Sequence, residues 1–504
     1  MPGWPCCDRA LVAEYSVTLG SLDESLLILS DVHLGNDLND LTAGHVRRSA
    51  RVDRDLVDLL AHYRRTPCAG KRWRLVIAGD FIDFIGMAIL PKGDELATEP
   101  SDEERAHGLG NASDHARLKL RAVVERHRAV FEAVAQFLGA GNAVTIVHGN
   151  HDVEFHWDAV KHELKTALAQ LASPGAKAED LASRIDFAPW FYYVGGVAYV
   201  EHGHQYDTLC STDHVMAPVS PLDPRRIARS FSDVFLRWVV RPTKGVPEYG
   251  HHGMGLADYV LLATRLGAGG LVRLAARFSS AVVELFRLRR GHLSEAAKAL
   301  REEHERRMNA LAEATRIGIE RLRALAALQV PPVTRSAQKI LASVLLDRLA
   351  VALSASAAIV ALAPLSTHHV WPWPVMVAIA VGWFFAHRHL MRRRRAWFGE
   401  RLDNDEILVE RAHHLARLFP AAFVVMGHTH VPEMLPIAQG TATYVNVGSW
   451  HEGEDDRVGA YRAARTHLVI HPAEQGPQAE FLTWGVEGPH KFVLSGARTA
   501  QRDS

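Results

Sequence analysis

The chain has 504 residues, of which 48% are hydrophobic and 23% are charged, an ordinary mixture for a globular protein. This length suits two or more domains, or one domain with a large insertion. Basic and acidic residues both number 57, so the chain lacks the overall positive field that draws proteins to nucleic acid. The four cysteines show no C-x-x-C spacing, which excludes common zinc and redox motifs and fits a reducing compartment. The first residues lack a secretory pattern, so we expect the chain to begin in the cytoplasm.

From residue 26 to about residue 207, short β-branched runs alternate with segments of helical periodicity. Strands and helices joined by short links predict a layered α/β domain. A loop rich in Gly, Asp and Glu, residues 91–111, is expected to be exposed beside the site. The predicted strands cover residues 27–30, 75–78, 143–147 and 197–200, and the predicted helices cover residues 45–65 and 114–138.

The next 200 residues, 208–404, have a different character and are expected to form a helical insertion. Residues 223–291 mix arginine with apolar residues, which indicates amphipathic helices with a basic face. Residues 294–328 are highly charged, rich in Ala and Leu, and free of proline. They predict one long solvated helix or a coiled-coil arm, and a plain surface helix of a lid is an equal alternative.

The most unusual segment of the insertion is residues 349–386, which contain no Asp, Glu, Lys or Arg. Pro364 and the polar residues 366–369 divide it into two apolar arms. A membrane-spanning helix needs about 20 apolar residues. Trp371 and Trp373 suit one membrane interface, and Arg388 with residues 392–395 suits a cytoplasmic anchor. We therefore expect a membrane-associated helical hairpin with both ends in the cytoplasm; the alternative is a hairpin buried in a dimer interface or against the amphipathic helices.

The α/β pattern returns from residue 405 onward. A helix is predicted over residues 408–418, and residues 494–504 resemble a polar tail. Residues 1–207 and 405–493 are therefore expected to be two parts of one α/β domain, separated by the insertion at 208–404. The predicted strands of the second part cover residues 423–426, 443–447, 467–470 and 480–484.

Polar residues follow five of the predicted strands, where open α/β sheets place their chemistry. Such Asp, Asn and His side chains form a mixed nitrogen and oxygen ligand set that suits manganese, iron or zinc. Two divalent cations about 3.5 to 4 Å apart can activate water against a phosphate ester or anhydride at neutral pH. The residues are Asp31 and His33 after the first strand, Asp80 after the second, Asn150, His151 and Asp152 after the third, His202 after the fourth, and His428 and His430 after residues 423–426.

These motifs, in this order, resemble the five signatures of the calcineurin-like metallophosphoesterases. The blocks are Asp31-x-His33, Gly79-Asp80-x-x-Asp83, Gly149-Asn150-His151-Asp152, His202-Gly203 and Gly427-His428-x-His430. The resemblance implies a layered αββα fold, in which helices flank two β-sheets, interrupted here by the helical insertion with its hydrophobic hairpin.

The resemblance also implies a pair of divalent metal ions, with manganese the favoured metal. It further implies a role for each site residue. Asp31, His33 and His430 would hold one metal, Asn150, His202 and His428 the other, and Asp80 would bridge them. His151 would be the catalytic histidine that binds the phosphate or protonates the leaving oxygen. Asp152 would orient His151. Asp83, His204, Asn36 and Asn446 stay outside this set, because a cap or a tight turn explains Asp83 and Asn446 equally well.

Within the family, the blocks at residues 31–35, 202–207, 427–432 and 446–450 are most similar to the UDP-2,3-diacylglucosamine hydrolases. These peripheral membrane enzymes cleave the diphosphate of a lipid-linked substrate. This chain departs from that branch in a far longer insertion and in His151, where the branch commonly has arginine. A phosphodiesterase or phosphoprotein phosphatase with a soluble substrate is the alternative enzyme, and a non-catalytic membrane adaptor is the third hypothesis. The oligomeric state stays open.

Overall fold

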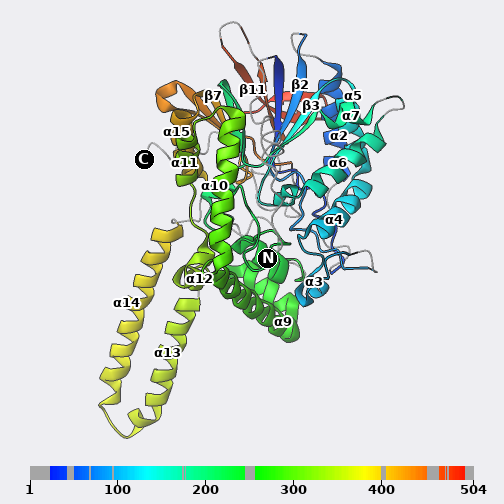
Figure 1. Ribbon diagram of the computed structural model, residues 1–504. Helices are drawn as coiled ribbons and strands as arrows, with labels where there is room; N and C mark the ends of the chain where they lie inside the picture. Colours follow the sequence, from blue (N-terminus) through cyan, green and yellow to red (C-terminus); the bar gives the residue numbers. More distant parts are fainter. Residues whose placement is uncertain are drawn as a thin grey trace.

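The computed structural model describes residues 23–41, 50–66, 70–92, 96–172, 175, 177–243, 256–344, 346–398, 404–450, 465–471, 473 and 476–493. Residues 1–22, the start of the predicted helix at 45–65 and the expected polar tail lie outside these ranges. The described chain is a mixed α/β structure with two mixed sheets flanked by helices (Figure 1).

The first sheet has seven strands in the order β12-β11-β10-β1-β2-β3-β4. Strands β1 to β4 are parallel, whereas β10, β11 and β12 add an antiparallel edge beside β1. All residues of β1 and β3 are buried, as expected for parallel strands covered on both faces. The strands are β1 Glu24–Leu29, β2 Arg72–Ala78, β3 Ala143–Val147, β4 Ile185–Ala188, β10 Thr466–His471, β11 Gln478–Gly485 and β12 Gly488–Lys491.

The second sheet has five strands in the order β5-β6-β7-β9-β8. Strands β6, β7 and β9 are parallel, and β5 and β8 close the edges in antiparallel register. Each sheet therefore contains strands from before the insertion and strands from after it. The strands are β5 Phe191–Val194, β6 Gly196–Glu201, β7 Ala421–Met426, β8 Glu433–Ile437 and β9 Ala442–Asn446.

The two sheets pack face to face through a core of mainly β-branched side chains. Val76 and Val147 from the first sheet meet Val200, Val425 and other residues of the second sheet in one buried cluster. A second cluster lies under α2, α4, α5 and α6 on the outer face of the first sheet, and a third lies under α10, α11 and α15 on the second. The order of layers is thus helices, sheet, sheet, helices.

Fourteen helices are described outside the short 3-10 and π turns. The predicted helix at 114–138 is two helices, because the chain breaks at His127, whose ring accepts the Gly35 N–H and pairs with Asp53. The helices are α2 Ala50–Arg65, α3 Asp102–His107, α4 Ser113–Arg126, α5 Arg128–Gly139, α6 Asp158–Leu171, α7 Ala178–Ala182, α8 Phe231–Phe235, α9 Leu256–Gly291, α10 Glu295–Thr315, α11 Ile319–Ala327, α12 Ala337–Ser343, α13 Leu346–Leu362, α14 Pro372–Phe398 and α15 Asn404–Leu418.

The expectation of one solvated arm over residues 294–328 is wrong. The chain forms α10 and α11, which are separated by Arg316 in a left-handed conformation with a φ of 56°. Apolar residues of both helices, including Leu311 and Leu322, are buried in the cluster over the second sheet. The loop expected at residues 91–111 also contains a short helix, α3, with a capping box at Ser101 and a buried Glu104.

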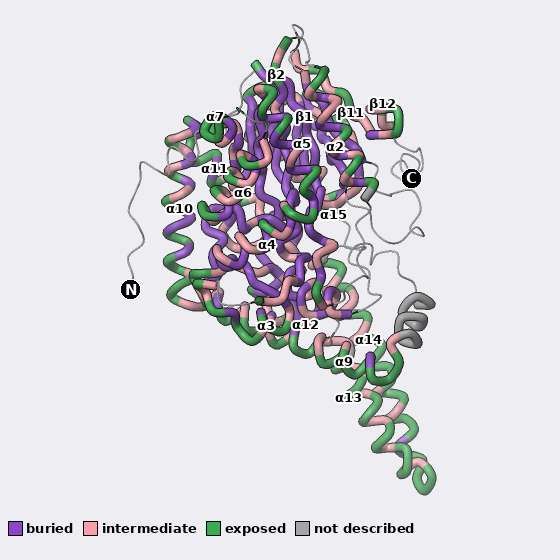
Figure 2. Tube along the Cα trace, turned by 90° about the vertical axis from the view of Figure 1, so that its right-hand side faces the viewer, coloured by how far each residue is buried: buried purple, intermediate pink, exposed green. Residues whose placement is uncertain are grey.

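The hydrophobic segment forms two antiparallel helices, α13 and α14, that project from the body of the protein. Figure 2 shows that most residues along α14 are exposed and that α13 is a mixture of exposed and half-buried residues. Large apolar side chains stand open to solvent, among them Val360, Trp373 and Phe385. Together with the later part of α9, these are three helices long and apolar enough to cross a membrane. The alternative of a hairpin buried against the amphipathic helices does not describe this structure.

Candidate metal centre

All seven predicted metal ligands lie just beyond the carboxyl ends of β1, β2, β3, β6 and β7. Asp31, His33, Asp80, Asn150 and His202 are buried. Parallel strands end at the same edge of a sheet, so residues far apart in the sequence meet there.

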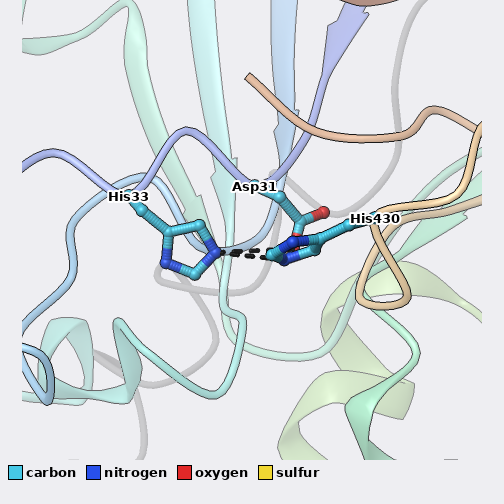
Figure 3. A group of neighbouring side chains, drawn as sticks. All are labelled: Asp31, His33 and His430. Atoms are coloured by element: carbon cyan, nitrogen blue, oxygen red, sulfur yellow. Dashed lines mark hydrogen bonds and ion pairs between the residues drawn. The ribbon is translucent and has the colours of Figure 1, made fainter. Parts of the chain in front are cut away.

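The first group contains Asp31, His33 and His430, whose side chains point toward one another (Figure 3). His430 Nε2 lies 3.0 Å from Asp31 Oδ1, and His33 Nε2 lies 3.7 Å from the same oxygen. The two imidazole Nε2 atoms are 3.3 Å apart. These three ligand atoms therefore converge on a point where a cation can sit.

Asp80 lies between the first group and a second one. Its Oδ2 is 3.6 Å from His33 Nε2 and 3.2 Å from His202 Nε2. Its other oxygen, Oδ1, accepts the backbone N–H of His151 at 2.9 Å. His202 Nε2 also lies 3.1 Å from Asn150 Oδ1, and its Nδ1 faces the Ala78 carbonyl at 2.9 Å. The Ala78 carbonyl fixes the tautomer with the proton on Nδ1, which leaves His202 Nε2 free to be a ligand.

His428 lies beside the second group, on the loop after β7, and its ring groups with Asp207 and Cys210. Its ring centroid is 5.2 Å from that of His202, and its backbone N–H donates to Asp31 Oδ2 at 3.0 Å. His428 Nε2 faces Asp207 Oδ2 at 3.2 Å, so Nδ1 is the ring atom left for a metal. Asp207 was not among the predicted site residues, although it stands in the block at residues 202–207.

The backbone at the centre is strained in a way that brings the side chains together. Asp31, His33, Asp80, His428 and His430 all have positive φ angles between 50° and 70°, which are uncommon for residues other than glycine. Such strain is concentrated at functional sites in proteins. The sharp turns aim each side chain back across the strand ends.

Two glycines allow the loops to approach this closely. A Cβ on Gly149 would lie 2.0 Å from Asp80 Oδ1, and one on Gly427 would lie 2.4 Å from Asp31 Oδ2. Both separations are shorter than real Cβ contacts, so the two carboxylates occupy the space that a side chain would fill. Glycine is the residue that permits such close approach of backbone to a site.

The charges of the centre fit divalent cations. Asp31 Oδ1 is buried, and the Nε2 atoms of His430 and His33 face it. Burial alone would raise the pKa of Asp31, but His430 and His202 hold that pKa well below its usual range. Burial would also raise the pKa of Asp80, but the charges of His202 and His151 outweigh this effect and lower that pKa. Ionised carboxylates and imidazoles within 4.8 Å of one another could hold metal ions in the Asp31–His33–His430 and Asp31–Asp80–His202 groups.

The structure corrects the role expected of Asp152. Its two carboxylate oxygens accept the backbone N–H groups of Gly149 at 2.6 Å and Phe81 at 2.7 Å, so it shapes the loop. His151 instead pairs through Nδ1 with Asp83 Oδ1 at 2.6 Å. Burial lowers the pKa of His151, yet Asp83 and Asp80 more than offset this and raise it to about 10. Asp83 is therefore the residue that orients His151.

The other residues left outside the predicted set have mixed outcomes. Asn446 forms a turn, since its Oδ1 accepts the Gly448 N–H, and its amide donates to the Gly427 carbonyl, which holds the loop that carries His428. His204 is buried with its ring centroid 5.4 Å from that of His202. Arg241 was not predicted; it donates to the Asn36 carbonyl at 2.6 Å and lies 3.5 Å from Asp83 Oδ2.

A small pocket adjoins the centre and includes Asn150 and His204 in its wall. Lys119 and Glu154 line it and are buried, and Glu154 Oε2 has no hydrogen-bond partner among the described residues. Burial lowers the pKa of Lys119 to about 7 and raises that of Glu154 to about 8. Burial therefore favours the neutral forms of Lys119 and Glu154.

The far wall of the pocket belongs to the helical insertion. Arg229 and Arg237 line this wall, and both pair with Glu103 of α3, at 2.9 and 3.0 Å. Arg226 pairs with Glu104 at 2.6 Å. These partly buried ion pairs fasten the start of the insertion over the centre.

Comparison of the chain with protein-family models and with curated proteins gave no match.

Proposed function

We propose that this protein is a hydrolase that uses two divalent metal ions, with manganese the favoured metal, to cleave a phosphoester or diphosphate bond. The observation that carries the proposal is the position of Asp80 Oδ2, 3.6 Å from His33 Nε2 and 3.2 Å from His202 Nε2. A metal pair needs one carboxylate between two groups of further ligands. The resemblance to calcineurin-like metallophosphoesterases, together with two mixed sheets flanked by helices, supports the same reading.

In the proposed reaction, the bound cations supply a lowered water pKa and neutralise charge on the phosphoryl group. Asp31, His33 and His430 hold one cation, Asn150, His202 and His428 hold the other, and Asp80 contacts both. His151 donates its Nδ1 proton to Asp83, so its Nε2 is available to bind the phosphate or to protonate the leaving oxygen. Asp83 is a positioning residue, because it fixes the ring plane of His151 and stabilises its protonated form.

We further propose that the substrate is lipid-linked, such as a UDP-diacylglucosamine-like diphosphate, and that the enzyme works at the cytoplasmic face of a membrane. Support comes from the exposed apolar helices α13 and α14 and from the pocket between the centre and the insertion.

A substrate panel assayed with manganese tests the proposal. The panel contains an aryl phosphate, an aryl phosphodiester, a nucleoside diphosphate sugar and its diacylated form, and the control is the Asn150→Ala variant. We expect hydrolysis that depends on manganese and on Asn150, with the diacylated diphosphate preferred. Preference for a soluble ester would favour the phosphodiesterase or phosphatase alternative. A protein that hydrolyses none of the four would favour the adaptor.

A further inference from the structure

The second part of α9, residues 268–291 beyond the kink at Gly267, is apolar on two opposite faces. One face packs against the insertion: Ala281 and Leu285 are fully buried in a cluster with Val234 and Ile340. Phe278 adds an edge contact to Phe235, with ring centroids 5.6 Å apart. The helix is thus held to the body of the protein along this face.

The opposite face is exposed and has the composition of a membrane-binding surface. Val272 and Val283, eleven residues apart and therefore on one side of the helix, are 70% and 69% exposed, and the small residues Ala276, Ser279 and Ser280 lie between them on that side. Residues 268–291 contain five arginines but one acidic residue, Glu284, whose side chain is only 13% exposed and lies 3.7 Å from Arg287.

Length alone would let this helix cross a bilayer, since residues 266–291 form a candidate span. Its packing excludes that arrangement, because a spanning helix would have to pull Ala281 and Leu285 out of the cluster they share with α8 and α12. A helix that keeps one face on the protein and exposes apolar and basic residues on the other is suited to lie in the plane of the membrane interface.

The position of the hairpin agrees with this placement. Helix α12 contacts α9, α13 and α14, so α9 lies at the base of the hairpin. Figure 1 shows α9 across the lower end of the α/β body, with α13 and α14 projecting away from it. The candidate span that contains α13 and the 3-10 turn after it, residues 346–367, has 22 residues, close to the about 20 that a hydrocarbon core of about 30 Å requires. With the hairpin inserted, α9 lies at headgroup level.

We propose that residues 268–291 of α9 dock on anionic phospholipid headgroups, as an interfacial helix beside the inserted hairpin. The arginines supply the attraction: Arg287 and Arg290 are exposed on α9, and Arg388 and Arg392 are exposed at the base of α14. Each basic residue near an anionic surface is worth about a fivefold change in binding. This docking adds a second membrane contact to the proposed function, and it depends on that function only through the insertion of the hairpin into the membrane.

Docking at this face would bring the centre close to the headgroups. Arg277 of α9 donates to Thr243 at 3.0 Å, and Arg241, two residues earlier, lies 3.5 Å from Asp83, the partner of His151. Only these few contacts separate the interfacial helix from the proposed catalytic histidine.

Photolabelling of the full chain in vesicles tests the proposal. The vesicles contain phosphatidylcholine with or without phosphatidylglycerol, and a phospholipid that carries a diazirine labels whatever touches the lipid. We expect labels at residues 271–283 in the anionic vesicles and in the hairpin in both. The Arg287→Gln/Arg290→Gln variant should lower the α9 label by about 25-fold, because two basic residues are lost, while the hairpin label stays as an internal control.

Three outcomes would overturn the inference: no lipid label on α9, equal α9 labels in neutral and anionic vesicles, or no effect of the double variant. A Val272→Asp variant should also lose the α9 label, whereas Val486→Asp, at a residue 92% exposed in the turn between β11 and β12, should not. Manganese-dependent hydrolysis of a soluble aryl phosphate is measured on the same samples. Loss of hydrolysis with retained labelling would count against the proposed function alone.

Discussion

The pairing of His151 with Asp83 can be tested by comparing Asp83→Asn with Asp152→Asn. Asp83 Oδ1 lies 2.6 Å from His151 Nδ1, and both residues are buried. A hydrogen bond to a charged group is worth about 1.5–3 kcal/mol, and a tenfold change in rate corresponds to about 1.4 kcal/mol. If this bond fixes the ring plane of His151 and stabilises its protonated form, Asp83→Asn should lower kcat by about 10- to 150-fold.

Asp152 should respond in the opposite way. Both of its oxygens accept backbone N–H groups, so the amide of Asp152→Asn would turn one donor toward another and cost about 1–3 kcal/mol of stability. The folded variant should keep most of its kcat. The assay is manganese-dependent hydrolysis of an aryl phosphate, with urea unfolding and bound metal measured for each variant. The reasoning is refuted if Asp83→Asn keeps full kcat, or if Asp152→Asn loses kcat without losing stability.

The remaining predictions concern the metals, the insertion and acid stability. Manganese at 100 times its Kd should stabilise the protein by about 2.7 kcal/mol per site, seen as a rise in Tm that Asp80→Asn abolishes. Leu322→Ala should cost about 2–5 kcal/mol in urea unfolding, because Leu322 is fully buried; a solvated arm would show almost no loss. Burial lowers the pKa of His304 to about 4, so its neutral form is favoured in the fold. Stability should therefore fall by about 3 kcal/mol as pH drops from 6.5 toward 4, and His304→Gln should remove that part of the pH dependence. Deleting residues 349–386 should abolish hydrolysis of the diacylated diphosphate but spare the aryl phosphate; equal survival of both would contradict the lipid-linked substrate.

The parts of the centre that the sequence made predictable share one local signal. Each ligand follows a run of apolar, β-branched residues, and such runs become buried parallel strands whose ends meet at one edge. Asp31, Asp80 and His202 could therefore be assigned to one site before any contact was known. The hairpin was equally visible, because an uncharged stretch of this length has few alternatives in a protein.

The features that sequence reasoning missed depend on contacts between distant segments. Asp152 stands next to His151 in the chain, yet its carboxylate turns back to the loop, and Asp83 reaches His151 from the loop after β2. The breaks at His127 and Arg316 interrupt stretches whose periodicity continues on both sides. Helical periodicity reports which face is apolar and contains no information on where tertiary contacts bend the chain.

The place at which the insertion leaves the second sheet has a consequence for biosynthesis. Strands β6 and β7 are neighbours in that sheet, but some 200 residues, including the whole hairpin, separate His202 from His428 along the chain. A ribosome makes the protein from its N-terminus, so the hairpin emerges before the last two histidines exist. The nascent chain meets its membrane, in this view, while the centre is still incomplete. Hydrolytic activity would then begin only after the protein has reached the surface on which it acts.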